Sequence, residues 1–251
     1  MEREVYSWLL MAWAGVAACV FIALQFLTAP YGRHARPGWG PTIHRTAGWV
    51  IMESPAVIVF LACFAVSGRR NSVSVSFLLL WLFHYVYRAF IYPFRLRGGQ
   101  LRMPVSVMAM AFLFNVMNGY LQGRGLFTFG PARGTEWFGD PRFIAGVVLF
   151  LGGYALNQRS DIILRGLRAP GESGYRIPYG GAFGLVSCPN YSGELVEWLG
   201  WAMLTWSPAG LVFFLWTAAN LVPRARSHHR WYLERFPDYP RQRKAVIPWL
   251  Y

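Results

Sequence analysis

The chain has 251 residues, of which 55% are hydrophobic and 14% are charged, and its formal net charge is +13. Because a water-soluble chain carries about 25% charged residues, this composition excludes an ordinary soluble domain and indicates a protein that crosses a membrane several times. No nucleic-acid-binding motif accompanies the positive charge, so we do not expect nucleic acid as a partner. Many arginines lie in short loops between apolar stretches, where they orient the chain and contact lipid headgroups or phosphates.

Seven apolar stretches are candidate membrane-spanning helices, because a bilayer core requires about 20 apolar residues. The first five, in chain order, are residues 8–29, 47–67, 72–94, 104–122 and 143–165. A sixth lies within 183–207 and a seventh over 208–222. Pro208 interrupts this last region, and a short or broken helix is expected there. The sequence therefore predicts an all-α, seven-transmembrane-helix bundle.

The distribution of basic residues predicts the orientation of this bundle. With the N-terminus outside, most loop arginines and the basic tail lie inside, so the positive-inside rule places the C-terminus in the cytoplasm. In a bacterium the membrane would be the inner membrane. No repeat or linker divides the chain, so residues 1–251 are expected to form a single membrane-embedded domain.

Cysteine and histidine patterns give no indication of a metal site. The three cysteines are scattered without paired spacing, so neither a disulfide framework nor a zinc site is expected. His228 and His229 are adjacent and point about 100° apart on a helix. With no cysteine or third histidine nearby, we expect no bound metal.

One carboxylate, Glu53, lies in the otherwise apolar segment AGWVIMESPAVIVFLACF. An ionised side chain at membrane depth costs about 2.5–3.5 kcal/mol on insertion scales, so such a residue indicates a functional site. The next stretch contains FHYVYRAFIYPF, with Tyr85 and Arg88. A buried carboxyl beside a tyrosine hydroxyl can hydrogen-bond a substrate carbonyl and stabilise charge that develops on its oxygen. The alternative is that Glu53 only satisfies a polar neighbour such as Arg88.

A second group of polar residues begins within the fifth apolar stretch and continues after it. Its members recur at helical spacings or lie in the glycine-rich segment GESGYRIPYGG: Asn157, Asp161, Arg165, Arg168, Tyr175, Arg176, Asn190, Glu194, Arg224, His228 and Tyr232. Arginines suit phosphates, while amides and carboxylates suit ribose hydroxyls and a carboxamide, as a large anionic dinucleotide requires. The alternative is a collar of arginines that reach toward the headgroups. No GxGxxG motif opens a helix after a strand, so such a site would not be of the Rossmann type.

Two segments of the C-terminal third form a recognisable pattern: GESGYRIPYGGAFGLVSCPNYSGELVEW and RARSHHRWYLERFPDYPRQRKAVIPWLY. Four earlier segments belong to the same pattern: MESP, FHYVYRAFIYP, NGYLQG and NQRSDIILRGLRAPGE. Together these segments resemble the steroid 5-alpha-reductase family. The resemblance implies a seven-helix integral-membrane enzyme that uses NADPH to reduce the double bond of a 3-oxo-delta-4 steroid.

The resemblance also implies roles for individual residues. Glu53 and Tyr85 would be the catalytic pair. The cofactor-binding residues would be Tyr31, Asn157, Asp161, Arg168, Tyr175, Arg176, Asn190, Glu194, Arg224, His228 and Tyr232. Helices 1–4 would form the substrate side, and helices 5–7 with the cytoplasmic loops the NADPH side. A lipophilic steroid or similar enone would enter from the bilayer, and the expected state is a monomer surrounded by membrane lipids.

Two positions depart from the family pattern, and two other function classes stay open. Met52 stands where the family often has Gln, and Leu96 where it often has Asn, so the exact substrate is not predicted. A membrane methyltransferase of the isoprenylcysteine type shares part of the C-terminal pattern, but His228 and His229 replace its two acids. A transporter or scaffold would require an inverted repeat or polar residues on most helices, and neither is visible.

Overall fold

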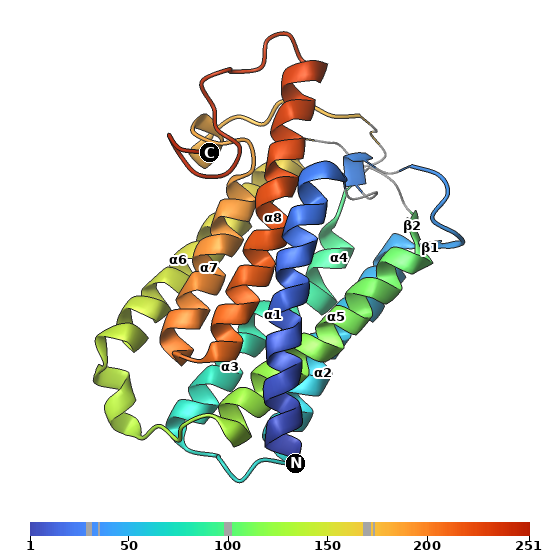
Figure 1. Ribbon diagram of the computed structural model, residues 1–251. Coiled ribbons are helices and arrows are strands. Elements are labelled where there is room, and N and C mark those ends of the chain that lie inside the picture. The colour runs from blue at the N-terminus through green and yellow to red at the C-terminus, as the bar shows by residue number, and fades with distance from the viewer. Residues whose placement is uncertain (29–31, 35, 98–101, 168–171, 173) are drawn as a thin grey trace.

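A computed structural model describes residues 1–28, 32–34, 36–97, 102–167, 172 and 174–251. Figure 1 shows a bundle of long helices, with the N-terminus at one end and the C-terminal segment near the other. In chain order the helices are α1 (Glu2–Phe26), α2 (Arg45–Ala65), α3 (Ser72–Val86), α4 (Tyr92–Arg95), α5 (Val105–Arg124), α6 (Pro141–Gly166), α7 (Pro189–Thr205) and α8 (Pro208–Arg235).

Shorter elements join these helices. They are the 3-10 turns η1 (Gly32–His34), η4 (Thr135–Gly139) and η5 (Gly181–Gly184), and the π-helical turns η2 (Tyr87–Ile91) and η3 (Gly125–Phe129). Two short strands, β1 (Thr42–His44) and β2 (Arg102–Pro104), pair antiparallel beside the bundle. The η2 turn joins α3 to α4 without a break, so these three elements form one long helical rod.

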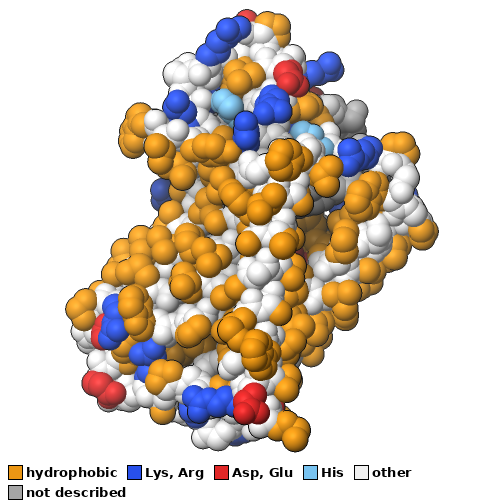
Figure 2. Space-filling model, viewed as in Figure 1, with side chains coloured by type: hydrophobic (Ala, Val, Ile, Leu, Met, Phe, Trp, Pro, Cys, Tyr) orange, Lys and Arg blue, Asp and Glu red, His pale blue; other side chains and the backbone are white. Residues whose placement is uncertain are grey.

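The prediction of an all-α membrane protein is confirmed. In the part of the chain that the structure describes, four helical segments are long and apolar enough to cross a membrane: Glu2–Phe26, Arg45–Ala65, Ser72–Arg95 and Val105–Phe129. Figure 2 shows hydrophobic side chains over the middle of the visible face and charged side chains gathered toward its two ends, as expected for a bilayer-spanning bundle. Seven spans, and the side on which the C-terminus lies, stay predictions.

The interruption expected at Pro208 is present, because α7 ends at Thr205, but the segment that follows is one long helix and not a short or broken one. Pro208 begins α8, at a position where its missing amide hydrogen costs no helical hydrogen bond. The Ser207 side chain accepts a hydrogen bond from the Gly210 amide and caps this end. From there α8 continues for 28 residues, through Pro223, well past the apolar stretch 208–222. The shorter helix is α7, with 17 residues.

Glycines bring α6 and α7 into close contact. A Cβ atom added at Gly153 of α6 or at Gly193 of α7 would lie closer than 3.0 Å to main-chain atoms of the opposite helix. Only glycine allows this approach. The two helices are therefore held at a distance at which polar side chains on their facing sides meet directly.

The hydrophobic core is largely aromatic and lies between α2, α3 and α7. Trp81 stacks on Phe60, with ring centroids 4.6 Å apart, and contacts Trp201 at 5.2 Å. The indole of Trp81 donates to the Ala56 carbonyl, and that of Trp201 donates to Gln122, so these buried donors are satisfied. This rigid core supports the polar residues that lie between it and the C-terminal end of the bundle.

Candidate functional site

A cavity of about 190 Å³ opens at the end of the bundle where the glycine-rich loop meets α4, α6, α7 and α8. Its lining residues are Arg33, Tyr92, Leu96, Arg97, Asp161, Leu164, Arg165, Leu167, Tyr175, Arg176, Asn190 and Tyr232. Five of these belong to the predicted cofactor set: Asp161, Tyr175, Arg176, Asn190 and Tyr232. The structure thus brings residues from α6, the loop, α7 and α8 to one cavity.

The cavity suits an anionic ligand. Arg33, Arg97, Arg165 and Arg176 line it, against one carboxylate, Asp161. A buried guanidinium nitrogen of Arg33 and one of Arg165 have no hydrogen-bond partner among the described residues. Such donors favour a ligand that brings oxygen acceptors, and phosphate groups fit that requirement.

Asn157 connects α6 to α7 beside this cavity. Its side-chain amide donates to the main-chain carbonyl of Asn190 and to Glu194 Oε1, both at 3.1 Å. The glycine-mediated contact between the two helices allows these bonds. The predicted residues Asn157, Asn190 and Glu194 therefore form one hydrogen-bonded group.

Arg88 links this group to Glu53. Its guanidinium lies 3.6 Å from Glu53 Oε1 and 3.9 Å from Glu194 Oε1. It also stacks over the rings of Trp49 and Tyr92, 4.9 and 5.2 Å from their centroids. Arg88 lies in the π-helical turn η2, a kind of irregularity that is frequent at functional sites. One partly buried cation thus joins the carboxylates of α2 and α7.

Glu53 itself is 9% exposed and is held on both sides. Arg88 lies against one carboxyl oxygen, and the Asn115 amide donates to the other at 3.3 Å. The same amide donates to the Met52 carbonyl at 2.7 Å. The contact between Glu53 and Arg88 that the alternative interpretation requires is therefore present. The catalytic role of Glu53 stays a prediction.

Tyr85 is buried on α3, the helix that follows α2 and its residue Glu53. Its ring packs on Trp81 and Trp198, with centroids 4.5 and 5.7 Å apart. Both catalytic candidates thus lie inside the bundle, on α2 and α3. Their catalytic roles stay predictions.

A second ionisable pair lies one turn from Arg88. His84 Nδ1 and Glu197 Oε1 are 2.7 Å apart, and the Glu197 side chain is 0% exposed. His84 and Arg88 are four residues apart on the α3–η2 rod, and Glu194 and Glu197 three apart on α7, so the two pairs form successive cross-links. The sequence interpretation does not find this pair, although the two spacings are its signal.

The segment η1 supplies residues that the sequence interpretation does not identify. Arg33 donates to the Tyr232 hydroxyl at 3.3 Å and lies over the rings of Tyr175, Trp231 and Tyr232. His34 Nε2 shares a 3.0 Å hydrogen bond with His228 Nδ1. Burial and the Arg33 charge lower the pKa of His34, so its ring is neutral at pH 7.

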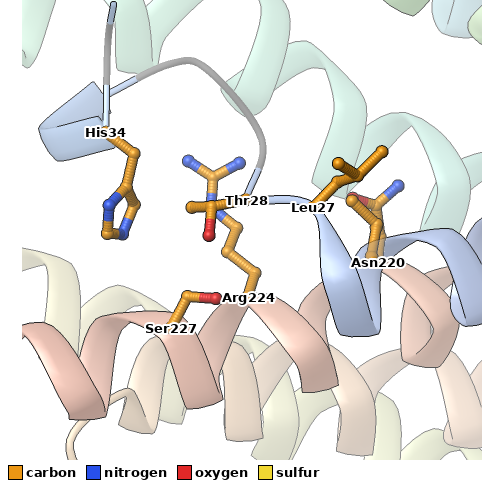
Figure 3. A pocket seen from close by; sticks show the side chains of 7 residues that line it. Leu27, Thr28, His34, Asn220, Arg224 and Ser227 are labelled. Carbon is orange, nitrogen blue, oxygen red and sulfur yellow. The ribbon is translucent and has the colours of Figure 1, made fainter.

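Arg224 lies in a different place from the cavity residues. With Asn220 and Ser227 of α8 it faces Leu27, Thr28 and His34 across a narrow pocket at the end of α1 (Figure 3). His228 is not among the described residues that line the larger cavity either, but it shares a 3.2 Å hydrogen bond with the Tyr191 hydroxyl beside it. Two further candidates, Tyr31 and Arg168, lie outside the described residues.

The positions that depart from the expected pattern are both near the site. Met52 is buried beside Glu53, and Leu96 lines the cavity. Tyr92, Arg97 and Arg165 also line it. Of these, Arg165 shares the Asn157 face at helical spacing, so the sequence contains a signal for it, whereas Arg97 lies in a loop without periodicity.

Comparisons with known proteins find similarity over the full length of the chain. The sequence model of a family described as 3-oxo-5-alpha-steroid 4-dehydrogenase matches residues 101–251. The chain is 47% identical to steroid 5-alpha-reductase DET2 of Gossypium hirsutum, over 100% of this chain and 99% of that protein. It is 42% identical to 3-oxo-5-alpha-steroid 4-dehydrogenase 1 of Macaca fascicularis (100% and 95%) and 39% identical to that of Homo sapiens (100% and 97%).

Proposed function

Because the chain belongs to the 3-oxo-5-alpha-steroid 4-dehydrogenase family, we propose that it uses NADPH to reduce the delta-4 double bond of a 3-oxo-delta-4 steroid or similar lipophilic enone. Membership makes the chain an oxidoreductase that acts on carbon–carbon bonds of steroids. The observation that carries the finer proposal is the Arg88 bridge. It connects the buried carboxyl of Glu53 to Glu194 beside the arginine-lined cavity.

The cavity and the hydrogen-bonded group beside it provide residues for the phosphates and the carboxamide of the cofactor. Arg97, Arg165 and Arg176 would bind the phosphates of the cofactor. NADPH carries a 2′-phosphate that NADH lacks, so arginines at this site would favour NADPH. Asn157 and Glu194 would bind the carboxamide. When bound, NADPH supplies the hydride that reduces the beta carbon of the enone.

Tyr85 and Glu53 would act on the ketone. The Tyr85 hydroxyl donates a hydrogen bond to the ketone oxygen and stabilises the negative charge that forms there as the beta carbon is reduced. Glu53, fixed by Arg88 and Asn115, orients that hydroxyl. A proton then adds at the alpha carbon. Loss of one such donor typically lowers kcat by about 10²–10³.

The surroundings fit a flat apolar substrate in a membrane. Aromatic residues of the core, such as Trp81 and Trp198, pack directly against Tyr85. We also propose that the protein is a monomer in contact with membrane lipids, with its C-terminus in the cytoplasm. The full-length similarity to steroid reductases argues against the methyltransferase and transporter alternatives.

The test is NADPH oxidation by the detergent-purified protein with a panel of 3-oxo-delta-4 steroids and simpler enones. Glu53→Gln and Tyr85→Phe should abolish turnover while NADPH binding survives. Full activity of both variants would refute the catalytic assignment. Binding of S-adenosylmethionine in place of NADPH would favour the methyltransferase instead.

A further inference from the structure

We propose that the C-terminal segment 236–251 is a strap that positions the cofactor loop 174–181, with Arg243 as its positioning residue. This inference rests on the proposed function, because it concerns affinity for NADPH. Figure 1 shows the segment leaving α8 and turning back toward the ends of α6 and α7. None of its residues is among the described residues that line the cavity.

The loop cannot fix its own conformation. It contains no helix or strand before η5, and Gly174, Gly180 and Gly181 have positive φ angles of 115°, 92° and 51°. Glycine at such positions leaves many other conformations accessible. Yet the loop carries Tyr175 and Arg176, which line the cavity. Their placement therefore depends on contacts from outside the loop.

Arg243 supplies such a contact. It is 3% exposed, and its Nη1 donates to the Pro178 carbonyl at 2.9 Å. Its guanidinium lies 5.0 Å from the ring centroid of Tyr179 and 5.1 Å from that of Tyr239. No ion pair to Arg243 is found among the described residues. A buried cation is costly, and here its contacts join the loop to the strap.

The strap is anchored on both sides of this contact. Past Arg243 it pairs with the segment that leads into α7: the Lys244 amide donates to Leu185, and the Ser187 and Cys188 amides donate to Lys244 and Ala245. The Ser192 hydroxyl then donates to the Val246 carbonyl at 2.5 Å.

On the other side of Arg243, the Tyr239 ring stacks on that of Tyr232, with centroids 4.9 Å apart and planes within 9°. Tyr232 lines the cavity. The strap thus reaches three walls of the cavity, namely the loop, the start of α7 and α8, while the residues around Glu53 and Tyr85 lie elsewhere. Its loss should act on cofactor affinity and leave the chemical step intact.

The experiment compares Arg243→Met, Arg243→Lys and Arg241→Met in the detergent-purified, full-length protein. Arg243→Met removes the bond to Pro178, and the dissociation constant and KM for NADPH should rise about tenfold or more. At saturating NADPH its kcat should stay within about twofold of the wild type. Arg243→Lys can still donate one charged hydrogen bond and should recover most of the affinity. Arg241 is exposed, so Arg241→Met is the matched control and should equal the wild type.

Thermal unfolding without NADPH separates positioning from general loss of fold. Should Arg243→Met fail to fold, Ser192→Ala removes only one strap anchor and should raise the KM for NADPH in the same direction, by a smaller factor. Unchanged NADPH affinity in the folded variants would overturn the proposal that segment 236–251 positions the loop. If the wild type itself binds no NADPH, the proposed function fails. Wild-type binding with an unaffected Arg243→Met would refute the strap alone.

Discussion

Replacing Arg88 with methionine should lower the stability of the protein, because it leaves the carboxyls of Glu53 and Glu194 without their shared cation. At N–O separations of 3.6 and 3.9 Å, the Arg88 interactions with Glu53 and Glu194 are each worth about 4 kcal/mol at an effective dielectric constant of about 20. Removing one partner of a buried ion pair costs about 3–5 kcal/mol, because a charge stays buried without compensation. The Arg88 side chain is 25% exposed, so we expect the lower end, about 3 kcal/mol of unfolding free energy.

Thermal unfolding of the purified protein measures this directly. A loss of about 3 kcal/mol lowers Tm by about 6–12 °C in a chain of this size. Arg88→Lys keeps the charge but not the two-sided geometry, so its Tm should fall between those of Arg88→Met and the wild type. In a Glu53→Gln background Arg88→Met should cost less, because one of its two charged partners is already neutral. A Tm for Arg88→Met equal to that of the wild type would refute this account of the bridge.

Three further perturbations test separate contacts. Asn115→Leu removes the amide that holds the second oxygen of Glu53, so kcat should fall about tenfold while NADPH affinity is unchanged; equal loss of both would indicate a general structural role. Gly153→Ala places a methyl group against the main chain of α7 and should lower the unfolding free energy by about 1–3 kcal/mol. Gly152 has open space around it, so Gly152→Ala is the control and should not lower it. Similar melting curves for the two variants would contradict the close packing of α6 on α7. Because the pKa of His34 is lowered from 6.5 in the folded state, its contribution to stability is present above about pH 6.5 and is lost as the pH falls through its lowered pKa. His34→Asn should therefore flatten the pH dependence of Tm between pH 7.5 and pH 5; the lower limit is about 1.5 units below the ordinary pKa of histidine. An unchanged slope would show that His34 does not contribute to the pH dependence of Tm.

Hydropathy predicts the apolar parts of the helices, and it fails where a helix continues into polar sequence. The stretches 47–67 and 143–165 agree with α2 and α6 to within two residues, because each stretch is a continuous apolar run that folds as one helix. The last stretch ends at residue 222, but α8 reaches Arg235. The final turns of α8 are polar, so their helical state depends on contacts with η1 and the C-terminal segment. A hydropathy pattern does not reveal such contacts.

The site shows a similar division. Four-residue spacing predicts which residues share a helix face, and Asn190 and Glu194 indeed meet Asn157. Spacing does not predict which faces meet across the bundle. The His84–Glu197 pair joins residues 113 apart in sequence, and Arg33 reaches Tyr232 across 199 residues. Such partners are fixed by the packing of whole helices, so only the three-dimensional structure reveals them.

Transfer of a labelled hydride tests the central claim most directly. The purified protein would be incubated with a 3-oxo-delta-4 steroid and NADPH that carries deuterium at its hydride-donating carbon, and the product would be analysed by mass spectrometry and NMR. We expect one deuterium at the former beta carbon with the wild type and no labelled product with Glu53→Gln or Tyr85→Phe. A wild-type product without deuterium at that carbon, or labelled product from both variants at the wild-type rate, would contradict the account.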